Sequence, residues 1–300
     1  MMKIDFKTIG KLFKKAFKTW LSRDPFRESS IIAYNAIFSL PGLLVVVVTL
    51  AGYCFGAEIV NRQVHNSISD AMGTETADQI QEMVLVAARS KDSVWATVLG
   101  IVTMVLGATG VFVQMQKSLN IIWEVEATTK KVGIWPMIRH RLFSFGLIIS
   151  IAFLLLMSLV ISSLLAAAGT WLQNRYTEAP LWVFTVLNFF VSLFIVSFLF
   201  ALMFKFLPDA KIKWRFVWVG SVVTALLFTI GKTLLGFYFG KAEPGSGYGA
   251  AGSIILILLW TSYSSMIVFF GAEFTKAYSQ RDVGSVPASE FGVKKKGREA

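Results

Sequence analysis

Apolar residues fall along this chain in long runs that are free of charge, separated by shorter polar stretches. Runs long enough to cross a bilayer as helix, which takes about 20 residues, occur at 29–57, 93–116, 142–174, 179–204 and 248–272. A sixth run, 216–231, is long enough only if its helix continues past Lys232 to Phe239. The pattern predicts an all-α, polytopic membrane protein with six transmembrane helices, at about 30–56, 94–116, 142–172, 180–204, 216–239 and 248–272.

Composition supports the same class of protein. Hydrophobic residues make up 55% of the chain, charged residues only 16%, and the mean hydropathy is +0.63, which is more apolar than a soluble domain of this length requires. The single cysteine, Cys54, excludes an internal disulfide and a cysteine metal cluster. The two histidines, His65 and His140, are too far apart in sequence for a metal-ligand motif. We therefore expect no metal and no cofactor.

The positive charges alternate between the connections. The N-terminal segment, the second and fourth connections and the C-terminal tail carry 8, 5, 4 and 6 Lys and Arg, against 3, 1 and 2 in the first, third and fifth. Positive charge gathers on the cytoplasmic side of membrane proteins, so both termini are expected in the cytoplasm. The net charge of +11 then anchors the cytoplasmic face to anionic lipid, its expected partner, rather than to nucleic acid.

Three segments lie outside the predicted spans. Residues 1–28 place apolar side chains every three or four positions with lysines between them, which predicts an amphipathic helix on the cytoplasmic leaflet. Because that apolar face is continuous, the alternative of an RNA-binding arm is weaker. The external connection 58–92 is expected to contain a helix packed on the spans through Ile80, Met83, Val84 and Ala87. The tail, 282–300, is expected to be disordered.

Four stretches together resemble the YihY/BrkB family of bacterial inner-membrane proteins. They are AYNAIFSLPGLL from Ala33, GATGVFVQMQKSLNIIWEV from Gly107, FLPDAKIKWRFVWVGSVVTALLFTIGK from Phe206 and YGAAGSIILILLWTSYSSMIVFFGAEFTKAY from Tyr248. Similar members carry an aromatic residue where Asn35 stands. The resemblance implies a place in the cytoplasmic (inner) membrane of a bacterium. Some members are linked to virulence through serum resistance, and some to export of lipid A precursors. The family's former label, a tRNA-processing ribonuclease, is regarded as a misassignment.

The residues themselves argue against catalysis. Phosphodiester hydrolysis needs clustered carboxylates with a metal, or a histidine pair, whereas Glu124, Glu126, Asp209 and Glu273 show no metal-binding pattern in sequence. No phosphate-binding loop is present, so this chain alone is not expected to be an ATP-driven pump. We therefore expect a protein that is not an enzyme.

Polar residues within the predicted spans are candidates for a substrate path, because lipid offers them no hydrogen-bond partner. The alternative for each is a structural role, such as hydrogen bonding between helices, a surface carboxylate at Glu273, snorkelling by Lys232 or a packing kink at Pro41. A cationic cytoplasmic rim and this proline kink complete the predicted site. The path candidates are Lys232, Asn35, Gln116, Asn120, Asn188, Tyr248 and Glu273, and the rim is Arg139, His140, Arg141, Lys211, Lys213 and Arg215.

Three functions compete. The preferred one is a transporter, resembling a flippase or exporter, that moves a lipid or other amphipathic anionic substrate across the membrane, with the substrate class taken from the resemblance. The second is a transporter of a small solute or ion, coupled to protons through Glu273. The third is a scaffold that only binds partner proteins. Whether the chain forms a homo-oligomer stays open.

Overall fold

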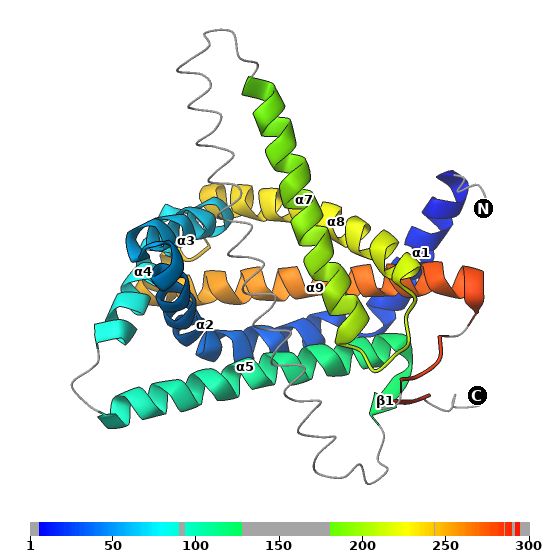
Figure 1. Cartoon of the computed structure of the whole chain (residues 1–300), viewed down its shortest axis with the longest axis horizontal. Helices are drawn as coiled ribbons and strands as arrows, with labels where there is room; N and C mark the ends of the chain where they lie inside the picture. The colour runs from blue at the N-terminus through cyan, green and yellow to red at the C-terminus, as the bar shows by residue number, and fades with distance from the viewer. Residues whose placement is uncertain are drawn as a thin grey trace.

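The fold is that of a computed structural model, which describes residues 6–89, 94–127, 181–242, 244–284, 286–289 and 292–294. Almost all of this part of the chain is helical (Figure 1). Two short strands are the exception to the all-α expectation. The elements are α1 (Phe6–Ser22), α2 (Pro25–Phe55), α3 (Ala57–Met72), α4 (Thr74–Arg89), α5 (Val94–Trp123), β1 (Val125–Ala127), α7 (Leu181–Phe206), α8 (Trp214–Ala242), the 3-10 helix η1 (Ser246–Ala251), α9 (Gly252–Val283) and β2 (Gly292–Lys294).

Helix α9 lies at the centre of the bundle, between α2 and α8, while α5 packs mainly on α2 and α7 mainly on α8 (Figure 1). Two glycines let α8 and α9 approach closely. A Cβ added at Gly220 would lie 1.7 Å from Thr275 Oγ1, and one added at Gly271 would lie 1.9 Å from Thr224 Oγ1. Small residues at helix contacts are typical of membrane bundles, where close packing replaces the hydrophobic drive.

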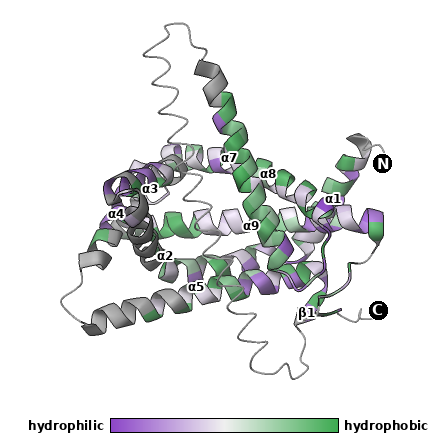
Figure 2. Ribbon diagram, in the orientation of Figure 1, coloured by the Kyte–Doolittle hydropathy of each residue, from purple (hydrophilic) through white to green (hydrophobic). Residues whose placement is uncertain are grey.

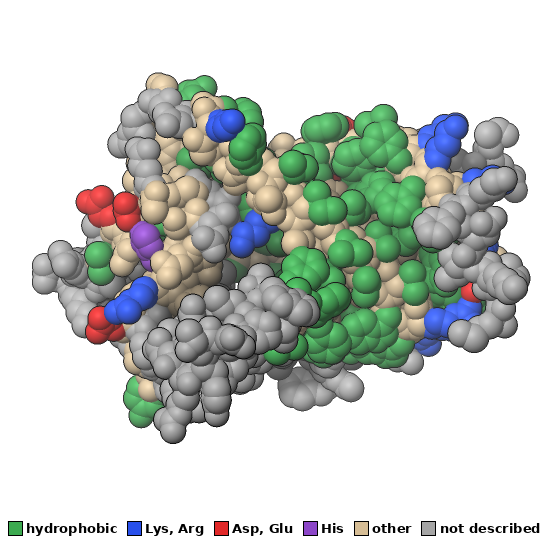
Figure 3. Space-filling view, turned by 90° about the horizontal axis from the view of Figure 1, so that it is seen from above, with side chains coloured by type: hydrophobic (Ala, Val, Ile, Leu, Met, Phe, Trp, Pro, Cys, Tyr) green, Lys and Arg blue, Asp and Glu red, His purple; other side chains and the backbone are tan. Residues whose placement is uncertain are grey.

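Three helices in the described ranges are long and apolar enough to cross a membrane, at Val186–Phe206, Trp214–Ala242 and Gly252–Val283. They correspond to the last three predicted spans. Figure 2 shows α7 hydrophobic along most of its length and α3 and α4 largely hydrophilic. On the face in Figure 3, hydrophobic side chains form a broad central field, with most charged side chains toward the two ends. The predicted span at 142–172 lies outside the described residues, and the total of six spans stays a prediction.

The segments between the spans differ in detail from expectation. Connection 58–92 contains two helices, α3 and α4, and Ile80 of α4 is buried with Phe239 and Ile257 of the bundle. Helix α1 is present, but part of its apolar face packs on α9. The expectation of a wholly disordered tail is wrong. Helix α9 continues to Val283, and β2 pairs antiparallel with β1, with Val125 opposite Lys294. This pairing gives the backbone N–H and C=O groups of the two strands hydrogen-bond partners.

Candidate functional site

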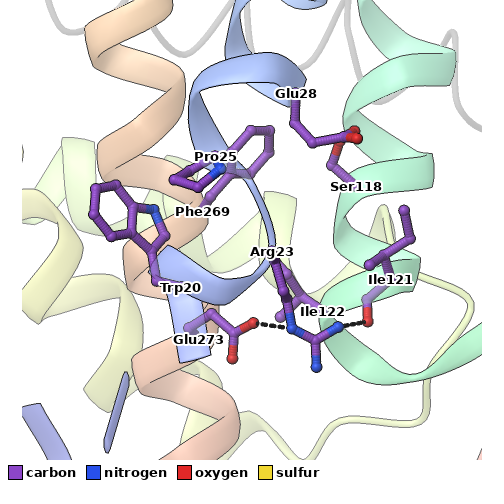
Figure 4. Close-up of a pocket in the computed structure, with 9 residues that line it drawn as sticks. All are labelled: Trp20, Arg23, Pro25, Glu28, Ser118, Ile121, Ile122, Phe269 and Glu273. Atoms are coloured by element: carbon purple, nitrogen blue, oxygen red, sulfur yellow. Dashed lines mark hydrogen bonds and ion pairs between the residues drawn. The ribbon is translucent and has the colours of Figure 1, made fainter. Parts of the chain in front are cut away.

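A small pocket lies where the α1–α2 link, the start of α2, the end of α5 and α9 meet (Figure 4). Its free volume of about 20 Å³ holds about one water molecule, which needs roughly 10–15 Å³ of such space. Charged and polar side chains face it beside apolar ones. The lining residues are Trp20, Arg23, Pro25, Glu28, Ser118, Ile121, Ile122, Phe269 and Glu273.

Arg23 joins three segments of the chain at this pocket. Its Nε lies 2.7 Å from Glu273 Oε1 on α9, and its Nη2 lies 3.2 Å from Glu124 Oε1, just after α5. Its Nη1 donates a hydrogen bond to the carbonyl oxygen of Ile121, in the last turn of α5 (Figure 4). The guanidinium therefore donates hydrogen bonds to Glu124 and to the Ile121 carbonyl, and its contact with Glu273 is an ion pair. Arg23 therefore connects the α1–α2 link to α5 and to α9.

Lys276 completes a cluster of four charges, Arg23, Glu124, Glu273 and Lys276, which we name the ion cluster. Lys276 Nζ lies 2.7 Å from Glu124 Oε1, and the side chains of Lys276 and Glu273 are only 7% and 3% exposed. Burial by itself would raise the pKa of Glu124. The hydrogen bond and charge of Lys276, followed by those of Arg23, outweigh burial and lower this pKa below its ordinary value. The cluster thus brings two basic and two acidic side chains together.

The turns that present these charges hold two residues in the left-handed region. Asp24, next to Arg23, has φ 53°, and Glu124 has φ 56°. Residues with a Cβ pay roughly 1–2 kcal/mol for this conformation, although aspartate adopts it more readily than glutamate. Such conformations persist where surrounding contacts hold them, and they gather at functional sites. The contacts of Glu124 with Arg23 and Lys276 hold the second of these turns.

A second carboxylate lies on the other side of the pocket. Glu28 Oε2 accepts hydrogen bonds from Gln114 Nε2 and from Ser118 Oγ, the latter at 2.8 Å. Arg27 Nη2 lies 3.1 Å from Glu28 Oε1, but the Arg27 side chain is mostly exposed. Glu28 therefore joins α2 to α5 through buried polar contacts. Glu28, Gln114 and Arg23 are site residues that the sequence prediction missed; the four-residue spacing of Gln114 and Ser118 was the available signal.

The link between α7 and α8 is tied to α5 and to the tail. Asn120 Nδ2 donates to Asp209 Oδ2 at 2.8 Å, and the Asp209 backbone N–H donates to Asn120 Oδ1 at 2.8 Å. The N–H of Ser289 donates to the Asp209 carbonyl at 2.8 Å, and the N–H of Lys211 donates to the Pro287 carbonyl at 2.9 Å. Asn120 thus has a structural role, joining the predicted second span to this link.

The structure brings Glu273 to the pocket and leaves most other predicted path residues elsewhere. Asn35 Nδ2 bonds the Ile31 carbonyl at 2.9 Å within α2, and Asn35 packs against Gly110 of α5. Gln116 is half-buried, and Tyr248 is exposed. Asn188 is half-buried on α7, and its Oδ1 has no hydrogen-bond partner among the residues described.

The structure describes three of the six residues of the predicted cationic rim. Lys211, Lys213 and Arg215 are exposed around the start of α8, and Arg215 forms an ion pair with Asp282. Arg139, His140 and Arg141 lie outside the described residues. Helix α2 runs through Pro41 without interruption, and a kink there stays a prediction.

Lys232 lies on the face of α8 that is turned toward the bundle. It is half-buried and shares this face with Phe228, Leu235 and Phe239, which lie four, three and seven residues away. Phe228 packs on Trp260 of α9, and Leu235 and Phe239 belong to an apolar cluster between helices. Within the described part of the chain, Lys232 has neither an ion pair nor a hydrogen bond. At about 1.5 Å per residue, Lys232 stands roughly 15 Å from the end of α8 at Ala242.

The arrangement combines an interior cation on one helix with a closed ionic junction at one end of the bundle. Ionisable side chains inside a membrane bundle are expensive, and they mark substrate or ion pathways. No group of three His, Cys, Asp or Glu side chains suited to a metal ion occurs in the residues that the structure describes.

Comparison with known proteins identifies relatives over most of the chain. The sequence model of the family described as virulence factor BrkB matches residues 16–293. A UPF0761 membrane protein of Saccharophagus degradans is 23% identical over 281 residues, 91% of this chain and 60% of the relative. One of Tolumonas auensis is 25% identical over 267 residues, 86% of this chain and 82% of the relative.

A third relative shows how the lengths differ. A UPF0761 membrane protein of Verminephrobacter eiseniae is 28% identical over 204 residues, 64% of this chain but only 48% of the relative. The matched region thus spans about half to three fifths of the Verminephrobacter and Saccharophagus relatives. No solved structure matches the chain. Because the family match covers nearly the whole sequence, this chain belongs to the virulence factor BrkB family, whose UPF0761 relatives are membrane proteins.

Proposed function

We propose that this protein is a transporter of the bacterial cytoplasmic membrane that moves a lipid or other amphipathic anionic substrate, with both termini in the cytoplasm. The observation that carries the proposal is Lys232, a cation on the inward face of a helix that is long and apolar enough to span the membrane. We propose no enzymatic activity for the chain.

An anionic headgroup fits the energetics of this lysine. A lysine at the centre of a spanning helix costs about 2.5–3.5 kcal/mol on insertion scales, and one nearer to a helix end, as Lys232 is in α8, costs less. No described acid forms an ion pair with Lys232, so a passing anionic group would offset this cost. On the opposite face of α8, Ile230, Leu234 and Phe237 form an apolar stripe that is largely exposed. The cation inside the bundle suits the charged head of such a substrate, and the exposed stripe suits contact with acyl chains at the outside of the bundle.

The ion cluster is the closed gate in this proposal. Its pocket of about 20 Å³ admits a water molecule but no lipid headgroup. Arg23, Glu273 and Glu124 connect three chain segments there, so a lipid route at this end requires their ion pairs to separate. Gates of this kind alternate between discrete packed arrangements.

The same pocket favours a second candidate, a transporter of a small solute or ion that is coupled to protons. Two buried carboxylates, Glu28 and Glu273, line a space of about one water molecule, which is the scale of a proton or ion path. Glu273→Gln removes one titrating group. If the second candidate is correct, the transport rate of Glu273→Gln no longer responds to a proton gradient. If the protein instead moves lipid without using a gradient, the lipid exchange rate is independent of the gradient both in native protein and in this variant.

The test is reconstitution into liposomes that contain a fluorescent anionic phospholipid, with chemical quenching of the outer leaflet. We expect the native chain to speed lipid exchange between leaflets, Lys232→Met to abolish the gain and Lys232→Arg to retain most of it. Lys241→Met is the matched control, because Lys241 is exposed at the end of the same helix. A fluorescent lipid A precursor tests the substrate class named by the resemblance. Exchange no faster than in protein-free liposomes, with both lipids, would reject the proposal and favour the scaffold.

A further inference from the structure

Helix α1 carries two apolar stripes, and only one of them is covered. Leu12 and Ala16 are 7% and 1% exposed and pack against α9. The Phe13 ring lies 4.8 Å from that of Phe274, centroid to centroid. Trp20 Nε1 donates to the Met266 carbonyl at 3.1 Å. This stripe fixes how α1 is rotated on the bundle.

The neighbouring stripe is about half exposed. Phe17 and Leu21, four positions apart and therefore on one face, are 53% and 52% exposed. Phe26, at the start of α2, is 58% exposed. The Trp20 ring lies between Phe17 and Phe26, with centroid distances of 5.6 and 6.3 Å. These rings form an aromatic row that runs from the end of α1 to the start of the helix predicted as the first span.

Lysines border this row on its outer side. Lys11, Lys14 and Lys18 follow one another at steps of three and four residues, so they form a stripe next to Phe17 and Leu21, and all three are exposed. Lys15 is turned differently, and its Nζ donates to Gln280 Oε1 at 3.3 Å. One flank of α1 thus presents apolar rings and, beside them, a continuous line of positive charge.

We propose that this flank of α1, formed by Phe17, Leu21, Lys11, Lys14 and Lys18, binds the headgroup region of an anionic lipid leaflet together with Phe26 at the start of α2. Aromatic side chains settle at the boundary between headgroups and acyl chains. Lysine stems lie along apolar surface and carry their charges outward to the phosphates. The row ends at Phe26, where α2 begins, which sets the flank at the level where the chain enters the bilayer. The proposal rests on the exposed face of α1 and is independent of transport.

The experiment measures lipid contact at single positions of the full chain in nanodiscs. In a Cys54→Ser background, which removes the only native cysteine, Phe17→Cys carries an environment-sensitive fluorophore. The nanodiscs contain brominated phosphatidylglycerol or brominated phosphatidylcholine at equal mole fraction. We expect the anionic quencher to be about twofold or more stronger, given the attraction of basic segments for anionic leaflets. Asn66→Cys, exposed on the largely hydrophilic helix α3, is the control and should be quenched by aqueous iodide instead.

Charge variants separate headgroup recognition from mere proximity to lipid. Lys11→Gln, Lys14→Gln and Lys18→Gln together should bring the two lipid quenchers to equal strength at position 17, while the three arginine replacements should keep the difference. Helical circular dichroism verifies that each variant is folded. Equal quenching by both lipids in the native lysine background would overturn the proposal. Protection of position 17 from both lipid and iodide would also overturn it, because a protein partner would then cover the flank.

Discussion

Removing the Arg23 side chain tests whether the ion cluster holds the bundle together. Arg23→Ala leaves the Glu273 carboxylate, 3% exposed, without its nearest cation. When the assay is run at alkaline pH, so that the remaining carboxylate stays ionised, buried and uncompensated, breaking a buried pair in this way costs about 3–5 kcal/mol. The lost pair with Glu124, whose side chain is 50% exposed, adds less than about 1 kcal/mol. Because Lys276 remains nearby, we expect a loss of about 3 kcal/mol in the free energy of unfolding.

A double-mutant cycle isolates the charge as the cause. Glu273→Gln removes the uncompensated charge, so Arg23→Ala combined with Glu273→Gln should cost only about 1–2 kcal/mol relative to native, less than Arg23→Ala alone. Arg27→Ala is the control, because the Arg27 side chain is 69% exposed, and it should cost less than about 1 kcal/mol. Unfolding is followed by helical circular dichroism as the sodium dodecyl sulfate fraction of mixed micelles rises. Equal losses for Arg23→Ala and Arg27→Ala, or no relief from Glu273→Gln, would refute the reasoning.

Three further predictions concern the packing, the charges and the tail. Gly220→Ala should destabilise by about 1–3 kcal/mol, because its Cβ meets Thr275, whereas Gly240→Ala, with no atom within 4 Å, should be neutral or slightly stabilising in the same unfolding assay. The pKa of Glu124 is lowered in the folded protein, so its contribution to stability is full above its ordinary value of 4.5 and is lost as the pH falls through the folded value. The stability difference between native protein and Glu124→Gln should therefore shrink below that pH; a constant difference across the range would contradict this. In the Cys54→Ser background, Ala127→Cys with Gly292→Cys, which are strand partners, should form a disulfide visible on a non-reducing gel, whereas Val125→Cys with Gly292→Cys should not.

The helices were predictable because a bilayer requires every backbone group to be bonded within the segment, which leaves long apolar runs in the sequence. The positions at which the helices end were harder to predict. Helix α9 runs past its apolar run to Val283, because Glu273 and Lys276 are neutralised by partners on other segments and can continue a helix inside the protein. The pairing of β2 with β1 could not be predicted, since it joins residues far apart in sequence and each strand is only three residues long.

The candidate site shows a similar limit. Arg23 was counted among the positive charges that anchor the chain at the cytoplasmic face and Glu28 was not singled out, and only the three-dimensional packing shows that both line a pocket with Glu273. Asn120 was a reasonable path candidate from its position in the sequence, but its two hydrogen bonds to Asp209 give it a structural role. For Lys232 the sequence left two orientations open. The packing of Phe228, Leu235 and Phe239 on the same face of α8 favours the inward one.

The rate of exchange of a fluorescent anionic lipid between the leaflets of reconstituted liposomes tests the proposed transport most directly. We predict that native protein raises this rate above that of protein-free liposomes, that Lys232→Met returns it to the protein-free value and that Lys241→Met leaves it raised. A native rate equal to the protein-free rate would contradict the proposed transport, and equal rates for native protein and Lys232→Met would contradict the role of Lys232.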